Sequence, residues 1–132
     1  MGKSLEVTKW KAKAESDFTA ANDLFKAKSS STDAICFHCQ QAVEKYLKAL
    51  LINCGMEFQR THDLMVLAEI LSSKYPELEE FKEDFSRLTF YAVDIRYPNE
   101  ECAPDAEEMR KALKCVKSVR RIFNSIIKTR KK

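Results

Sequence analysis

Two thiols and a histidine lie together in the sequence at a spacing that metal and redox sites use. Cys36 and Cys39 are separated by two residues, and His38 is one of them. On a helix both thiols fall within an apolar arc, while His38 points about 100° away from Cys39. A zinc site would also need a second ligand pair, and no strand precedes the thiols as in a thioredoxin-type motif. The pattern therefore favours core cysteines that act as small apolar residues, and it predicts no metal site.

Charged residues on otherwise apolar helix faces are the next candidates. Arg96 lies at the edge of an apolar stripe, where a guanidinium needs an acid or a phosphate as its partner. Asp17 lies on the apolar face of the first predicted helix. Two interpretations stay open for both residues, a ligand site or a structural ion pair, either with each other or with Lys45 and Glu44. The ion pair is the favoured one.

The segment 33–54 combines a continuous apolar arc with a mixed opposite side. That side carries five polar residues, His38, Gln41, Glu44, Lys45 and Lys48, and two apolar ones, Phe37 and Ile52. Apolar side chains among polar ones are typical of a protein contact surface. Another helix of the same bundle could equally cover this side, and both interpretations stay open.

The elements that position these residues are helices. Glycine occurs only at positions 2 and 55, and proline only at 76, 98 and 104, which leaves long stretches without helix breakers. Apolar periodicity predicts helices over Leu5–Lys28, Asp33–Cys54, a segment carrying Leu64–Leu71, a long segment from Pro76 to Ile95, and a last segment from about Asp105. The predicted boundary residues are Ser31 or Thr32, Gly55, Thr61, Tyr97 with Pro98, and Asp105 in a capping box with Glu108.

Length and composition fit one helical domain. The 132 residues predict a single domain over 1–132, an all-α, up-and-down bundle of four to five helices with a frayed basic tail from about residue 128. No apolar run approaches the roughly 20 residues that span a bilayer, and the first residues do not resemble a secretory signal. Five cysteines, an odd number, favour reduced thiols. We therefore expect a soluble cytoplasmic protein with no membrane association.

The acidic and basic residues that sum to a net charge of +3 are strongly separated along the chain. Residues 69–108 contain twelve acidic and four basic residues, whereas residues 110–132 contain ten basic residues and no acidic one. In the last helix Arg110, Lys114, Lys117 and Arg121 share one stripe. This stripe suits a phosphate backbone or an acidic partner. A solvated face, or packing beside the acidic segment, is the favoured alternative.

Three separated motifs resemble the HEPN domain family. They are the run CFHCQQAVEKYLKALL (36–51), THDL (61–64) and RYP (96–98), and Trp10, Asp17 and Leu24 of the opening helix fit as well. The resemblance extends over roughly Leu5 to Ile127. It implies a dimeric bundle of four to five helices, and in many members a gene beside that of a minimal nucleotidyltransferase, in a two-protein system of toxin–antitoxin character.

The resemblance also bears on catalysis. Members that cleave RNA carry an arginine followed, after four to six residues, by a histidine that moves a proton while the arginine holds the phosphate. This sequence keeps Arg96 and lacks the histidine, because residues 97–103 are YPNEECA. The resemblance therefore implies a homodimeric module that binds nucleotide or RNA without cleavage, needs no cofactor and pairs with a small nucleotidyltransferase.

Two alternatives remain. One is a divergent metal-free ribonuclease in which Arg96 works with His38, His62 or Tyr97. The other is a purely structural bundle, and for His62 at a predicted helix N-terminus a structural role is favoured. The candidate ligand or interface residues are Asp17, Phe37, His38, Gln41, Glu44, Lys45, Lys48, His62, Arg96 and Tyr97.

Overall fold

The structure, a computed structural model, describes residues 2–29, 31–58, 60–92 and 104–130. Its elements are α1 (Gly2–Lys26), α2 (Thr32–Asn53), α3 (Leu64–Ser72), the 3-10 helix η1 (Pro76–Phe81), α4 (Lys82–Thr89), the 3-10 helix η2 (Phe90–Ala92) and α5 (Ala106–Arg130). The described residues contain no strand. The predicted all-α bundle is therefore confirmed.

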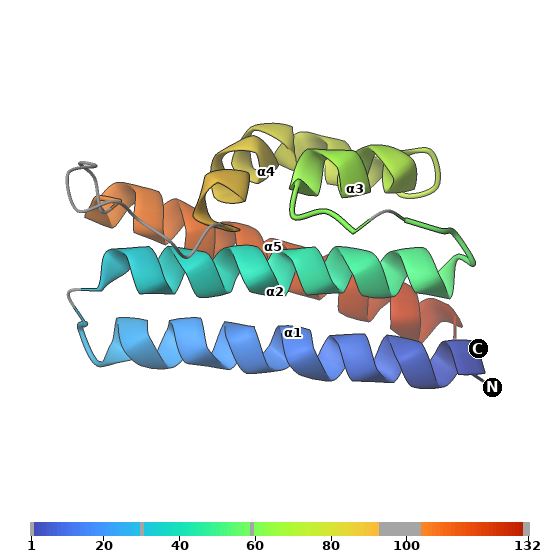
Figure 1. The fold of residues 1–132 in the computed structure, drawn as a ribbon, viewed down its shortest axis with the longest axis horizontal. Helices are drawn as coiled ribbons and strands as arrows, with labels where there is room; N and C mark the ends of the chain where they lie inside the picture. Colours follow the sequence, from blue (N-terminus) through green and yellow to red (C-terminus); the bar gives the residue numbers. More distant parts are fainter. Residues whose placement is uncertain (1, 30, 59, 93–103, 131–132) are drawn as a thin grey trace.

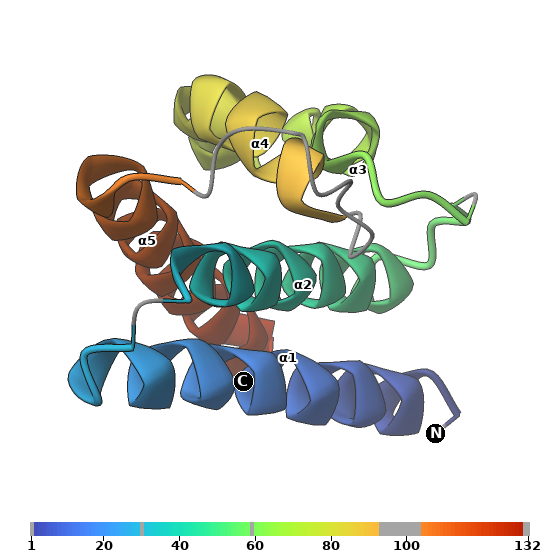
Figure 2. The ribbon, with the colours of Figure 1, turned by 60° about the vertical axis from the view of Figure 1, so that its left-hand side comes forward.

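Helix α2 lies at the centre of the bundle (Figure 1). The long helices α1 and α2 run antiparallel, side by side, and are joined by a short turn. Helix α5 packs against α2 on a second side, and the layer made by α3 and α4 covers a third, as the rotated view confirms (Figure 2). Fourteen of the 22 residues of α2 are buried, because helices approach it from several directions.

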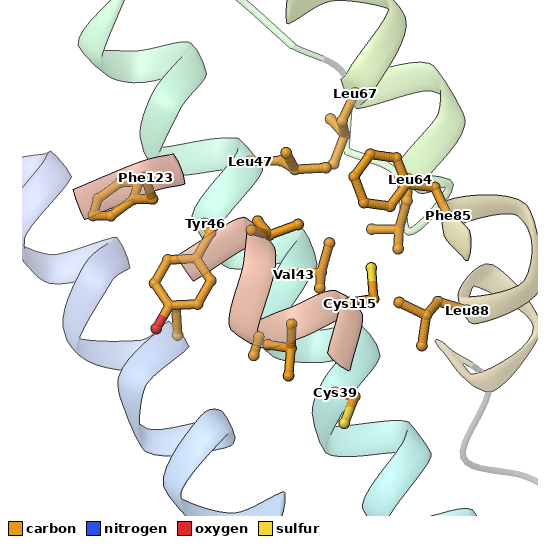
Figure 3. Close-up of a cluster of buried hydrophobic side chains, with 14 of the residues drawn as sticks. Cys39, Val43, Tyr46, Leu47, Leu64, Leu67, Phe85, Leu88, Cys115 and Phe123 are labelled. Carbon is orange, nitrogen blue, oxygen red and sulfur yellow. The ribbon is translucent and has the colours of Figure 1, made fainter. Parts of the chain in front are cut away.

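The core forms where α2, α3, α4 and α5 converge (Figure 3). The Tyr46 ring packs against that of Phe123 from α5, with 5.3 Å between the ring centroids. Leu47 faces the α3 side of the core, and Cys39 and Cys115 fill small spaces as apolar residues would. Each fully buried leucine or phenylalanine contributes about 1.5–3 kcal/mol of transfer free energy. The predicted apolar arc of α2 is buried as expected, apart from Cys54, which is half-buried.

Most of the predicted helix ends are present. Gly55 has a φ of 71°, a left-handed conformation that suits glycine, and it terminates α2 as predicted. Ser31 precedes α2 but makes no side-chain capping bond. The carboxylate of Asp105 accepts from the backbone N–H of Glu108, which caps α5. The carboxylate of Glu108 accepts from the hydroxyl of Tyr91.

Thr61 is not the cap of α3, and this prediction was wrong. Asp63 is the N-cap, and its carboxylate accepts from the backbone N–H of Met65. Thr61 instead accepts from the backbone N–H of Asp63 with its hydroxyl, so it orders the turn before the helix. Aspartate caps at least as well as threonine, and the apolar stripe begins only at Leu64, which places the first helical residue after Asp63.

The predicted continuous helix from Pro76 to Ile95 was also wrong in its described part. The segment is a 3-10 helix to Phe81, an α-helix over Lys82–Thr89 and a second 3-10 helix to Ala92. The Thr89 hydroxyl donates to the carbonyl of Phe85 and accepts from the backbone N–H of Leu64. This side chain competes with the local helical ladder and ties the end of α4 to the start of α3. The predicted end at Tyr97 and Pro98 lies outside the described residues.

Candidate functional site

The polar side of α2 is largely buried beneath other parts of the same chain. The side chain of Glu44 is 4% exposed and that of Lys48 is 9% exposed. Contacts from His62 and Phe58 in the 54–63 connection, and from Trp10 of α1, account for this cover. Intramolecular cover is therefore the better description of this part of the predicted mixed face.

Glu44 is the centre of a buried hydrogen-bond network. Its carboxylate accepts from the Lys48 ammonium at 2.9 Å, from the His62 Nδ1 at 2.8 Å and from the Gln40 amide at 3.1 Å. The Gln40 amide nitrogen also donates to the backbone carbonyl of His62 at 3.1 Å, and its oxygen accepts from Gln41 at 2.6 Å. A buried carboxylate needs such a set of donors to stay charged.

The cation of this network sits against two aromatic rings. The Lys48 ammonium lies 5.5 Å from the ring centroid of Trp10 and 5.8 Å from that of Phe58. The two rings meet edge to face, with centroids 6.5 Å apart. A desolvated ammonium over aromatic faces gains cation–π attraction in addition to its ion pair. Lys48 is thus fully engaged inside the chain.

The network keeps Glu44 ionised and orients the ring of His62. Burial alone would raise the pKa of Glu44, but the hydrogen bonds from Lys48, His62 and Gln40 outweigh it and hold that pKa below its usual value. An ionised Glu44 accepts the Nδ1–H of His62, which leaves Nε2 as the second ring nitrogen on a side chain that is 67% exposed. A histidine oriented by a carboxylate in this way is the arrangement that proton-transfer sites use.

A second cluster joins α1 to α2. Asp17 binds the His38 Nδ1 at 2.9 Å and the Lys45 ammonium at 2.5 Å. The ring of Phe37 meets that of His38 edge to face, with centroids 5.5 Å apart. Asp17 and Lys45 therefore form one of the ion pairs that the sequence left open. All three charged or titratable groups of this cluster are partly shielded from solvent.

A third cluster could not be foreseen from local spacing. The guanidinium of Arg120 binds both carboxylate oxygens of Glu15, at 2.7 and 2.9 Å, and stacks over the ring of Phe18. The buried Tyr46 donates its hydroxyl to the same carboxylate. The hydrogen bond from Arg120 holds the pKa of Glu15 below its usual value. The one available signal was Tyr46 within an apolar arc, because a buried phenol needs a partner.

The stripe on α5 differs from all three clusters. Arg110, Lys114, Lys117 and Arg121 are exposed and lie opposite the buried apolar residues of this helix. Within the described part of the chain, none of these four side chains is in an ion pair, whereas Lys111 pairs with Glu107 and Arg120 with Glu15. No ion pair joins α4 to α5 among those residues. The stripe is therefore an uncompensated basic surface.

Cys36, Cys39 and Cys115 behave as core residues. Cys36 and Cys39 are fully buried, and burial raises the pKa of the Cys39 thiol far above its usual value. Among the described residues, no three histidine, cysteine or acidic side chains are grouped so that they could hold a metal ion. Arg96 and Tyr97 lie outside the described residues, so the structure places neither of them relative to the three clusters.

Comparison with known proteins identifies the family. The model of the HEPN domain family matches residues 7–126, and the chain therefore belongs to that family. No curated protein and no solved structure matches the chain. In the described part of the chain, no helix is both long enough and apolar enough to cross a membrane.

The Glu44 network yields a prediction about stability and pH. Replacing Glu44 by Gln leaves the buried Lys48 cation without its counter-charge, and should lower the free energy of unfolding by roughly 3 kcal/mol at pH 7. Because the pKa of Glu44 is lower in the folded state, its contribution is complete at neutral pH and is lost as the pH falls through that lowered pKa. Denaturant unfolding should therefore show a smaller difference in unfolding free energy between the wild type and Glu44→Gln at pH 3 than at pH 7.

The matched control is Glu79→Gln, which removes an exposed partner of Lys82 on the surface. That change should leave the unfolding free energy unaltered within error, since exposed pairs contribute little. An equal loss for Glu44→Gln at both pH values would show that the network is not held by the charge of Glu44.

Proposed function

We propose that this HEPN domain is a cytoplasmic binding module that holds nucleotide or RNA without cleaving it, forms a homodimer and works with a small nucleotidyltransferase protein. The observation that carries the ligand class is the uncompensated basic stripe of α5. Membership of the HEPN family supports the dimer, the partner protein and the two-protein, toxin–antitoxin-like setting.

The stripe fits a phosphate backbone better than it fits bases. Arg110 and Arg121 are eleven residues apart, which is about 16 Å along a helix and long enough for more than one phosphate. No exposed aromatic residue lies among these four side chains on α5. The helix therefore offers no stacking platform for unpaired bases. Contacts of this kind fix a nucleic acid in place and carry little sequence information.

The lysines of α2 are less available to a ligand than the basic residues of the α5 stripe. Lys45 and Lys48 each have an acidic partner, and both are half-buried or buried. A phosphate would have to displace Asp17 or Glu44 to reach them, which would leave a carboxylate desolvated and unpaired. This comparison favours α5 as the ligand surface over the α2 residues that the sequence suggested.

Charge reversal on the stripe tests RNA binding. The double substitution Lys117→Glu with Arg121→Glu should weaken binding of single-stranded RNA by about tenfold or more at low salt, because two phosphate contacts become repulsive. The slope of log K against log salt should flatten by about 0.7 for each lost contact, and the loss should be similar for unrelated RNA sequences. Fluorescence anisotropy titrations at several salt concentrations measure both effects.

The control changes the same number of charges elsewhere. Lys9→Glu with Lys13→Glu alters two exposed lysines of α1 and should weaken binding far less. Equal losses in the two double variants would assign RNA affinity to net charge alone, and the α5 surface would be rejected.

The partner protein needs its own test. The chain should co-purify with the nucleotidyltransferase encoded beside its gene when the two are expressed together, and a tagged chain that elutes alone would contradict that part of the proposal. An unrelated nucleotidyltransferase serves as the negative control.

A divergent metal-free ribonuclease is the second candidate, and the Glu44–His62 pair is the observation that favours it. His62 has the exposed side chain and oriented ring that a proton carrier needs. Against it, His62 reaches α2 at Glu44 whereas α5 packs on α2 at Tyr46, and these two residues lie on different sides of the helix. RNA on the α5 stripe of one chain would therefore lie away from His62.

Cleavage can be measured directly. Wild-type protein incubated with RNA and EDTA should leave the RNA intact, as should Arg96→Ala and His62→Gln. Cleavage by the wild type that either substitution abolishes would replace the binding module with the ribonuclease. Gel analysis of end-labelled RNA, with a catalytically competent ribonuclease as positive control, resolves the two outcomes.

A further inference from the structure

A groove runs between α4 and α5 on the outside of the bundle. Its deep part is lined from one side by Arg87, Leu88 and Tyr91, and from the other by Lys111, Ala112 and Cys115. Leu88, Ala112 and Cys115 are buried and form an apolar floor. The groove continues along Glu80, Glu83 and Lys114 in one direction and reaches Phe90 in the other.

The groove has the anatomy of a protein contact site. Its floor is apolar and its rims are charged, an arrangement that recurs at specific interfaces. The two rims have opposite net signs in this stretch, because η1 and α4 supply three acidic residues and one basic residue whereas α5 supplies two lysines: Glu80, Glu83, Asp84 and Arg87 on one rim, Lys111 and Lys114 on the other. No ion pair crosses the groove within the described part of the chain, so Glu83 and Lys114 keep their charges available for another molecule.

Phe90 is a protrusion that the open mouth of such a groove would accept, whereas the deep apolar part has room for about one water molecule. Its side chain is 77% exposed, more than any other large apolar residue that the structure describes as exposed. It lines the mouth of the groove beside Tyr91 and Lys111. An aromatic anchor filling a desolvated pocket is the commonest source of binding energy at protein interfaces.

We infer that a second copy of this chain covers the groove, with Phe90 of each copy placed in the mouth of the other's groove. This inference rests on the homodimer of the proposed function and adds the surface through which the two copies meet. A groove and its matching protrusion on the same face can both be satisfied by one two-fold axis. An unrelated partner would have to supply an aromatic anchor that this chain already carries.

The rim charges agree with a two-fold arrangement. A two-fold axis parallel to the groove lays the two grooves face to face in the same direction and brings the acidic rim of each copy, at Glu83, against the basic rim of the other, at Lys114. The same favourable pairing then occurs twice. An antiparallel arrangement, with the axis perpendicular to the groove, would set like charges against each other, so the rims also select the orientation.

Sedimentation equilibrium without RNA, over a concentration series, tests the surface. Wild-type protein should be a dimer, and Phe90→Glu should raise the dissociation constant at least tenfold. Leu5→Glu is the matched control, because Leu5 is also exposed, at 56%, but lies at the start of α1. Circular dichroism should show that both variants keep their helices, and Phe90→Ser replaces Phe90→Glu in the assay if the latter does not fold.

A charge exchange tests the orientation. Glu83→Lys and Lys114→Glu should each weaken the dimer at low salt, and the two together should restore it, since the opposite charges meet again. A dimer that tolerates Phe90→Glu and both single reversals would overturn the groove and leave the homodimer itself intact. A wild-type monomer at every concentration would instead contradict the homodimer of the proposed function, and RNA binding by α5 would still be judged by its own titrations.

Discussion

The burial of α2 is the constraint on which the rest of the structure depends. A helix with neighbours on several sides keeps little of its polar side in water, so most of its polar side chains need a partner within the protein, and the amide nitrogen of Asn53 is a buried exception. Three clusters meet this requirement, and each ties α2 to a different element. Glu44 binds the 54–63 connection through His62, Lys45 binds α1 through Asp17, and Tyr46 shares the Glu15 carboxylate with Arg120 of α5. These pairs join α2 to three of the segments that surround it.

The same constraint divides the charges of the molecule into two groups. Cations close to α2 are engaged in pairs that are costly to open, because removing one member leaves the other desolvated. Cations on the outer side of α5 have no such partner among the described residues, and they remain free to meet an external anion. Sequence alone gave no reason to rank Lys45 below Lys117, since both are lysines on the polar side of an amphipathic helix. Burial distinguishes the two lysines, because Lys45 is half-buried and Lys117 is exposed.

Local rules predicted what is local. The helices, the apolar arc of α2, the stop at Gly55 and the cap at Asp105 all follow from spacing within a few residues. One error was itself local, since Asp63 and not Thr61 caps α3, and the other features that were missed lie where distant segments meet. The hydroxyl of Thr89 at the end of α4 accepts from the backbone N–H of Leu64, 25 positions earlier, and Glu15 binds Arg120 across 105 positions. No periodicity in one helix reports such a contact. Glu44 and His62 were both recognised as candidates. Their pairing could not be predicted, because it depends on how the connection after α2 returns to that helix.

The two surfaces assigned to α5 can be used at the same time. Lys111, on the groove side, and Lys117, on the stripe, lie about 120° apart around the helix, with Lys114 between them. A second copy in the groove therefore covers the flank of α5 and leaves Lys117 and Arg121 facing solvent. Two chains related by a two-fold axis would then carry two basic stripes on one particle. RNA that spans both stripes would gain the effective-concentration advantage of a bivalent ligand. Dimerisation and RNA binding would in that case strengthen each other, with Lys114 as the residue at which the two contacts meet.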